Sequence, residues 1–85
     1  PQADVLIALT HIGIREDERL AAACQGLHLI VGGHSHVTLT APEVIGRVPI
    51  AQAGWFGHYL GRVTLGLGAE GRVASVTGQL ESLKA

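Results

Sequence analysis

The sequence predicts an α/β fold in which one parallel β-α-β unit is followed by mainly antiparallel strands. Two apolar runs, residues 5–9 and 27–31, lie on either side of a segment of helix-forming residues. Neither run alternates with polar residues, which is typical of parallel strands buried on both faces, and we expect the first run to be a central strand. Residues 59–67 and 72–83 are strand-like and are joined by a glycine-containing turn, which favours an antiparallel pair.

The helix of the β-α-β unit is predicted between the two apolar runs. Acidic side chains are favourable near the amino end of a helix, and we expect three of them to form a solvated helix start: Glu16, Asp17 and Glu18. The helix continues through Cys24, which we expect to be a small core residue, and stops at Gly26. The crossover between the two strands is expected to be right-handed.

The middle of the chain predicts shorter elements. Residues 44–45 and 48–51 flank a Gly-Arg pair and form a hairpin-like connection. Residues 52–58 contain two glycines and predict a loop.

The composition limits the classes of function. The chain has 85 residues, enough for one small domain, but only 15% of them are charged, against about 25% in a typical domain. We therefore expect part of its apolar surface to be covered by a missing portion of a longer polypeptide. The net charge of −1 gives no reason to expect a nucleic acid polymer as partner. No apolar run approaches the roughly 20 residues of a membrane span, and a single cysteine excludes an internal disulfide.

Three histidines follow the two predicted parallel strands. His11 comes two residues after the first run, and His34 and His36 lie in the Gly-Gly-His-Ser-His segment that directly follows the second. In open α/β sheets, ligands bind at the carboxyl ends of parallel strands. Because neutral imidazole is the commonest metal ligand in proteins, the pattern predicts a metal site. In an extended segment His34 and His36 would point the same way about 7 Å apart, which suits two neighbouring metals.

Four segments in series resemble the calcineurin-like metallophosphoesterases, in the branch of 5'-nucleotidases and cyclic-nucleotide phosphodiesterases. They are residues 9–13 (Leu-Thr-His-Ile-Gly), 32–36 (Gly-Gly-His-Ser-His), 52–54 (Gln-Ala-Gly) and 60–62 (Leu-Gly-Arg). The resemblance implies a layered α/β/β/α sandwich, of which residues 1–85 would be the carboxyl-terminal part of the catalytic domain, with no complete second domain.

The same resemblance implies a site for two divalent metal ions, which could be Mn, Zn, Fe or Mg. His11 and His34 would bind one ion and His36 the other. The family's remaining ligands and its catalytic histidine belong to amino-terminal motifs that these 85 residues do not contain. We therefore expect no catalytic residue in this chain, which alone would be inactive, and its partner would be the missing amino-terminal half of the same domain.

The resemblance further implies that the intact protein hydrolyses a small-molecule phosphate ester, in particular a nucleotide, in the periplasm or outside the cell. Two alternatives stay open. One is a thiosulfohydrolase-like hydrolase with a two-manganese centre. The other is a non-catalytic metal-binding or structural module.

Other residues near these motifs are expected to have structural roles. Gln52 would form hydrogen bonds within its loop. His28, at the start of its strand, would be either exposed or paired in a structural hydrogen bond. Trp55 and Phe56 would pack against the missing half, and Ser35 would point away from the metal site.

Overall fold

The computed structural model describes residues 5–54, 57–68 and 72–83. The expectations for Trp55 and Phe56 therefore concern residues outside the described ranges. The elements are β1 (Ile7–Leu9), α1 (Ile14–Ala23), β2 (Leu29–Val31), β3 (Glu43–Ile45), β4 (Val48–Ala51), β5 (Tyr59–Leu67) and β6 (Val73–Ser82).

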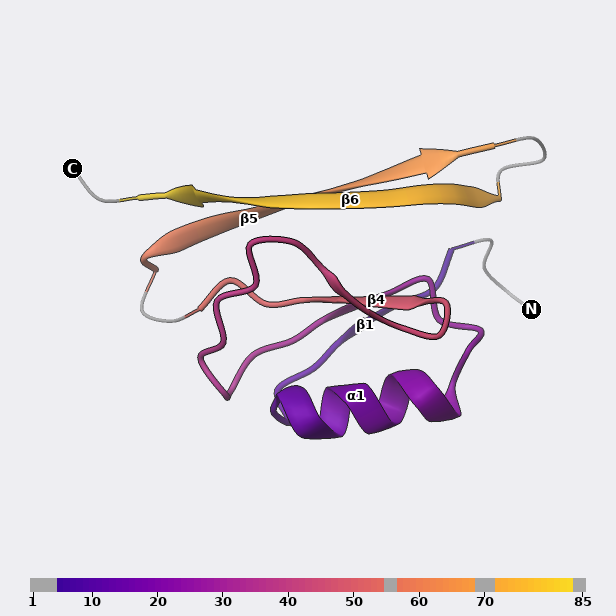
Figure 1. The fold of residues 1–85 in the computed structure, drawn as a ribbon, viewed down its shortest axis with the longest axis horizontal. Helices are drawn as coiled ribbons and strands as arrows, with labels where there is room; N and C mark the ends of the chain where they lie inside the picture. The colour runs from indigo at the N-terminus through magenta and orange to yellow at the C-terminus, as the bar shows by residue number, and fades with distance from the viewer. Residues whose placement is uncertain (1–4, 55–56, 69–71, 84–85) are drawn as a thin grey trace.

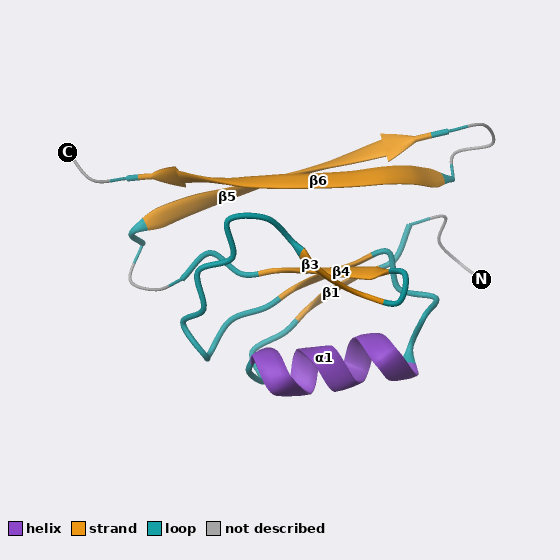
Figure 2. Ribbon diagram, viewed as in Figure 1, coloured by secondary structure: helices purple, strands orange, loops and turns teal. Residues whose placement is uncertain are grey.

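The described residues form three layers (Figure 1). A four-stranded sheet in the order β1-β2-β4-β3 has α1 on one face and the β5–β6 hairpin over the other (Figure 2). Strands β1, β2 and β4 are parallel, and β3 is antiparallel to β4. The predicted α/β fold is confirmed, and these layers are compatible with part of an α/β/β/α sandwich.

The first strand is at the edge of its sheet, so the expectation of a central strand is wrong. β1 pairs only with β2 among the described residues, and Leu9 is 85% exposed. Leu6 and Ile7 are also about half exposed. The apolar run is compatible with a strand buried on both faces, but it does not determine which neighbours are present to bury it.

The core lies between α1 and the sheet. Ala21 of the helix is fully buried with Ile30 of β2 and with Val48 and Ile50 of β4. Burying each of these larger aliphatic side chains contributes about 1.5–3 kcal/mol. Cys24 lies just beyond the helix end and is exposed, so the prediction that it belongs to the core is wrong.

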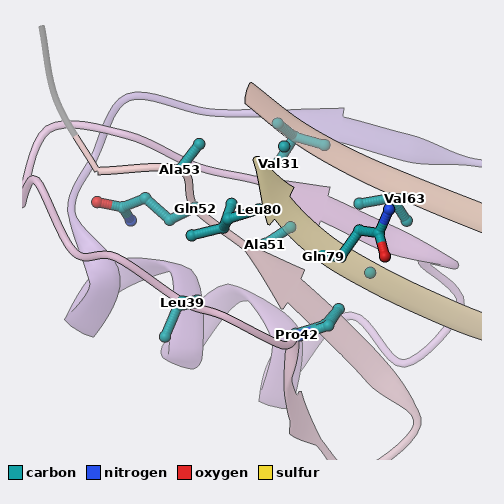
Figure 3. Close-up of a pocket in the computed structure, with 11 residues that line it drawn as sticks. Val31, Leu39, Pro42, Ala51, Gln52, Ala53, Val63, Gln79 and Leu80 are labelled. Carbon is teal, nitrogen blue, oxygen red and sulfur yellow. The ribbon is translucent and has the colours of Figure 1, made fainter. Parts of the chain in front are cut away.

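The hairpin packs over the sheet and leaves a cavity of about 320 Å³ between them (Figure 3). Val31 and Ala51 line the cavity from the sheet, and Val63 and Leu80 line it from the hairpin. None of its described lining residues is a histidine. The cavity is lined mainly by half-buried apolar side chains and opens to solvent. The chemistry expected of the imidazoles belongs to a different place in the fold.

Candidate metal centre

The predicted metal centre lies where β1 and β2 end. The two parallel strands are in register, with Leu9 opposite Val31, and the pairing continues one residue further because the Thr10 amide donates to the Val31 carbonyl at 2.9 Å. The loop that follows β1 and the loop that follows β2 therefore begin at the same edge of the sheet.

Two of the three predicted histidines meet at this edge. Nε2 of His11 lies 3.3 Å from Nδ1 of His34, and the two rings are inclined at 71° with their centroids 5.0 Å apart. Both side chains are exposed, so the pair is accessible to a ligand from solution.

The distance between these nitrogens suits a shared metal ion. Imidazole nitrogens bind zinc at about 2.0–2.1 Å, usually with tetrahedral geometry. Two nitrogens bound in this way lie about 3.3 Å apart by simple trigonometry. Without a metal ion, the same two nitrogens are within hydrogen-bond distance of each other, with the donor set by the tautomers of the rings.

His36 is placed differently. His34 and His36 both have positive φ angles, 73° and 58°, and the Ser35 amide donates to the Gly33 carbonyl at 2.9 Å. The segment is therefore a tight turn, and the expectation that an extended chain points both histidines the same way is wrong. The described residues contain no group of three or more His, Cys, Asp or Glu side chains positioned for one metal, so His36 is not part of the His11–His34 pair.

The turn conformation has an energetic cost. Left-handed backbone costs an L-residue other than glycine about 1–2 kcal/mol, and such strain is concentrated at functional sites. Two strained histidines within three residues therefore support a functional assignment for this turn.

Ser35 joins the turn to the start of the helix, which the sequence analysis missed. The amide of Ile14 donates to Oγ of Ser35 at 2.9 Å. Gly13 occupies the N-cap position and has no side chain with which to cap the helix itself. No local signal in the sequence could have indicated this bond, because Ser35 is 21 residues away from Ile14.

Asp17 was also misjudged, because it was expected to be solvated. Its side chain is fully buried beneath the two loops. The hydroxyl of Thr10 donates to Oδ1 of Asp17 at 2.6 Å. On the other side, Oδ2 of Asp17 occupies the space that a β-carbon on Gly32 would need.

The expectations for Gln52 and His28 agree with the structure. Gln52 is 3% exposed, and its Oε1 accepts the amide of Val37 at 2.8 Å, which holds the loop after β4. Nδ1 of His28 accepts the amide of Leu6 at 2.9 Å, at the end of β2 opposite the candidate metal centre.

Comparisons with known proteins agree with the geometry. No protein-family model matches the chain. The chain is 38% identical over 81 residues to the trifunctional nucleotide phosphoesterase protein YfkN of Bacillus subtilis (strain 168), an alignment covering 92% of this chain and 6% of YfkN. It is 36% identical over 64 residues to the metallophosphoesterase YunD of the same organism, covering 75% of this chain and 14% of YunD.

A venom enzyme gives a similar result. The chain is 33% identical over 91 residues to the snake venom 5'-nucleotidase of Macrovipera lebetinus, covering 86% of this chain and 22% of that protein. The chain is thus homologous to the metallophosphoesterases. Within them, its curated relatives include 5'-nucleotidases, as its motifs predicted. It spans less than a quarter of the length of these three relatives.

Proposed function

We propose that residues 1–85 are the carboxyl-terminal part of a metallophosphoesterase catalytic domain, and that the longer polypeptide hydrolyses phosphate esters of nucleotides. The observation that supports this most strongly is the 3.3 Å approach of His11 to His34 at the ends of two parallel strands. It occurs in a chain homologous to metallophosphoesterases.

His11 and His34 would hold one divalent ion, and His36 would contribute to a second. Bound divalent ions in such a site polarise the phosphoryl group and neutralise its developing charge. The protein's own contribution is positional: the paired strands set the separation of His11 and His34, and the exposed rings leave the site open to substrate. Manganese, zinc, iron and magnesium all remain compatible with this assignment.

A nucleotide is the proposed substrate because of the relatives' names. YfkN is a nucleotide phosphoesterase and the venom relative is a 5'-nucleotidase. The venom relative also supports our proposal that the protein acts in the periplasm or outside the cell. No helix among the described residues is long and apolar enough to cross a membrane.

The missing amino-terminal half is the proposed partner of the β1 edge. Three large apolar side chains are exposed along this edge: Leu6, Ile7 and Leu9. Unpaired edge strands readily accept another strand, and an apolar edge is stabilised when it is covered. This half would supply the remaining metal ligands and the catalytic histidine, so the 85-residue chain alone is expected to be inactive.

The test uses the longer polypeptide with Mn²⁺ or Zn²⁺ and a nucleoside monophosphate as substrate. His34→Ala should abolish turnover, because the variant lacks one of the two paired nitrogens. His28→Ala is the matched control, since His28 lies at the opposite end of β2. Turnover of the His34→Ala variant at the unsubstituted rate would contradict the proposal. Hydrolysis of thiosulfate esters instead of nucleotides would favour a thiosulfohydrolase, and no hydrolysis at all would favour a non-catalytic module.

A further inference from the structure

We propose that Asp17 is a positioning residue for the His11–His34 pair. This inference rests on the proposed function, because it assigns a role to Asp17 only if the two histidines share a metal ion. The buried carboxyl group contacts Thr10, which directly precedes His11, and Gly32, which precedes the turn containing His34. It therefore lies between the two loops that present the imidazoles.

The contact with Thr10 fixes the loop after β1. The hydroxyl of Thr10 donates to Oδ1 of Asp17 at 2.6 Å, and the Asp17 amide donates to the Gly13 carbonyl at 2.9 Å. The amide bond to Gly13 is the first backbone hydrogen bond of the helix and does not depend on the side chain at position 17, so the Asp17 side chain holds this loop through Thr10. A change in the side chain of Asp17 would be transmitted to the position of the His11 ring through Thr10.

The contact with Gly32 fixes the loop after β2. Oδ2 of Asp17 lies next to the α-carbon of Gly32, in the space where any other residue would have its β-carbon. The Gly32 amide in turn donates to the Ala51 carbonyl at 2.8 Å, which anchors this point to β4. The close approach sets how near the turn at 33–36 lies to the helix and to His11.

Helix stability alone does not account for this arrangement. Glu16 is also in the first helical turn, is exposed, and pairs with Arg19 at 2.8 Å. It provides the favourable interaction with the helix dipole without being buried. Asp17 is instead fully buried, and its Oδ2 has no hydrogen-bond partner among the described residues. Burying such a group is unfavourable, so its benefit must come from the loops that it contacts.

The expected effect concerns the affinity for metal. Residues that orient metal ligands from behind usually change metal affinity by about 10–100-fold when they are substituted. We expect Asp17→Ala to weaken Zn²⁺ binding by a factor in this range. Asp17→Asn keeps the size of the side chain and an acceptor oxygen for Thr10, and should restore most of the affinity. Thr10→Val should weaken binding as Asp17→Ala does, whereas Thr10→Ser should not.

The experiment measures the Zn²⁺ affinity of the longer polypeptide by competition with a chromophoric chelator. Each variant is measured well below its own unfolding temperature, so that a loss of stability does not change the result. Glu16→Gln is the matched control, because it removes an acidic group from the same helical turn without touching either loop. His34→Ala defines the affinity that remains without the pair.

The outcomes separate the two proposals. If the unsubstituted chain and His34→Ala bind Zn²⁺ equally, the shared metal centre is wrong, and the role of Asp17 is overturned with it. If His34→Ala weakens binding but Asp17→Ala and Thr10→Val bind like the unsubstituted chain, only the role of Asp17 is overturned. A loss in Asp17→Ala and Thr10→Val, with recovery in Asp17→Asn and Thr10→Ser and no change in Glu16→Gln, supports the inference.

Discussion

Replacing Gly32 by alanine tests how tightly the loop after β2 is packed. The new β-carbon would overlap Oδ2 of Asp17. The Asp17 side chain is short and fully buried, and its other oxygen is bonded to Thr10, so it has little freedom to move away. Overpacking a tight site costs about 1–3 kcal/mol. For a domain of this size, that loss lowers the unfolding temperature by roughly 5–20 °C.

The chain offers a matched control for this substitution. A β-carbon on Gly26 would meet no heavy atom within 4 Å, and Gly26 has no positive φ angle. Gly26→Ala should therefore be neutral or should stabilise the chain by up to about 1 kcal/mol, because alanine has less conformational freedom when unfolded. Thermal unfolding followed by circular dichroism measures both variants under the same conditions.

A double variant tests the cause of the destabilisation. Asp17→Ala removes the overlapping carboxyl group, so adding it to Gly32→Ala should cost less than the sum of the two single losses. Additive losses would show that Asp17 is not the obstacle. A Gly32→Ala variant that unfolds at the same temperature as the unsubstituted chain would refute the packing argument altogether.

Two further substitutions test other contacts. Burial raises the pKa of Glu43 above 4.5, as do a hydrogen bond that its protonated carboxyl group donates to Glu18 and the negative charge of Glu18, so the native state keeps a proton that the unfolded chain loses. The contribution of Glu43 to the free energy of unfolding is therefore greatest below pH 4.5 and falls as the pH rises through the raised pKa. Between about pH 4 and about pH 7, the unfolding temperature of Glu43→Gln should increase relative to that of the unsubstituted chain. A difference that stays constant with pH would contradict the assignment. Ser35→Ala removes the acceptor of the Ile14 amide and should lower the free energy of unfolding by about 0.5–2 kcal/mol in urea titrations, whereas an unchanged midpoint would exclude a capping role.

The elements of the fold could be predicted because they depend on local patterns. The uninterrupted apolar runs predicted β1 and β2. The residues on either side of the glycine-containing turn predicted the β5–β6 pair, which the structure confirms to be antiparallel. The helix begins at Ile14, two residues before the predicted start. Its first amide is bonded to Ser35, which is 21 residues away in the sequence, and no local pattern contains that contact.

The details of the candidate site depended on tertiary contacts and were harder to predict. The spacing of His11 and His34 relative to two parallel strands was sufficient to predict that they meet. The left-handed backbone at His34 and His36 was not predictable from spacing, because it occurs at residues that rarely adopt it. In the sequence, Asp17 cannot be distinguished from any other acidic residue at a helix start. Its burial depends on two loops that are brought next to it only by the tertiary structure.

The central claim is that His11 and His34 share one metal ion, and nuclear magnetic resonance of the histidine ring nitrogens tests it most directly. In a Zn²⁺ titration of the ¹⁵N-histidine-labelled longer polypeptide, Nε2 of His11 and Nδ1 of His34 should shift together with one dissociation constant. His28, whose Nδ1 accepts the Leu6 amide away from the site, should not respond in that step. Independent shifts of His11 and His34, or a shift of only one of them, would contradict the claim.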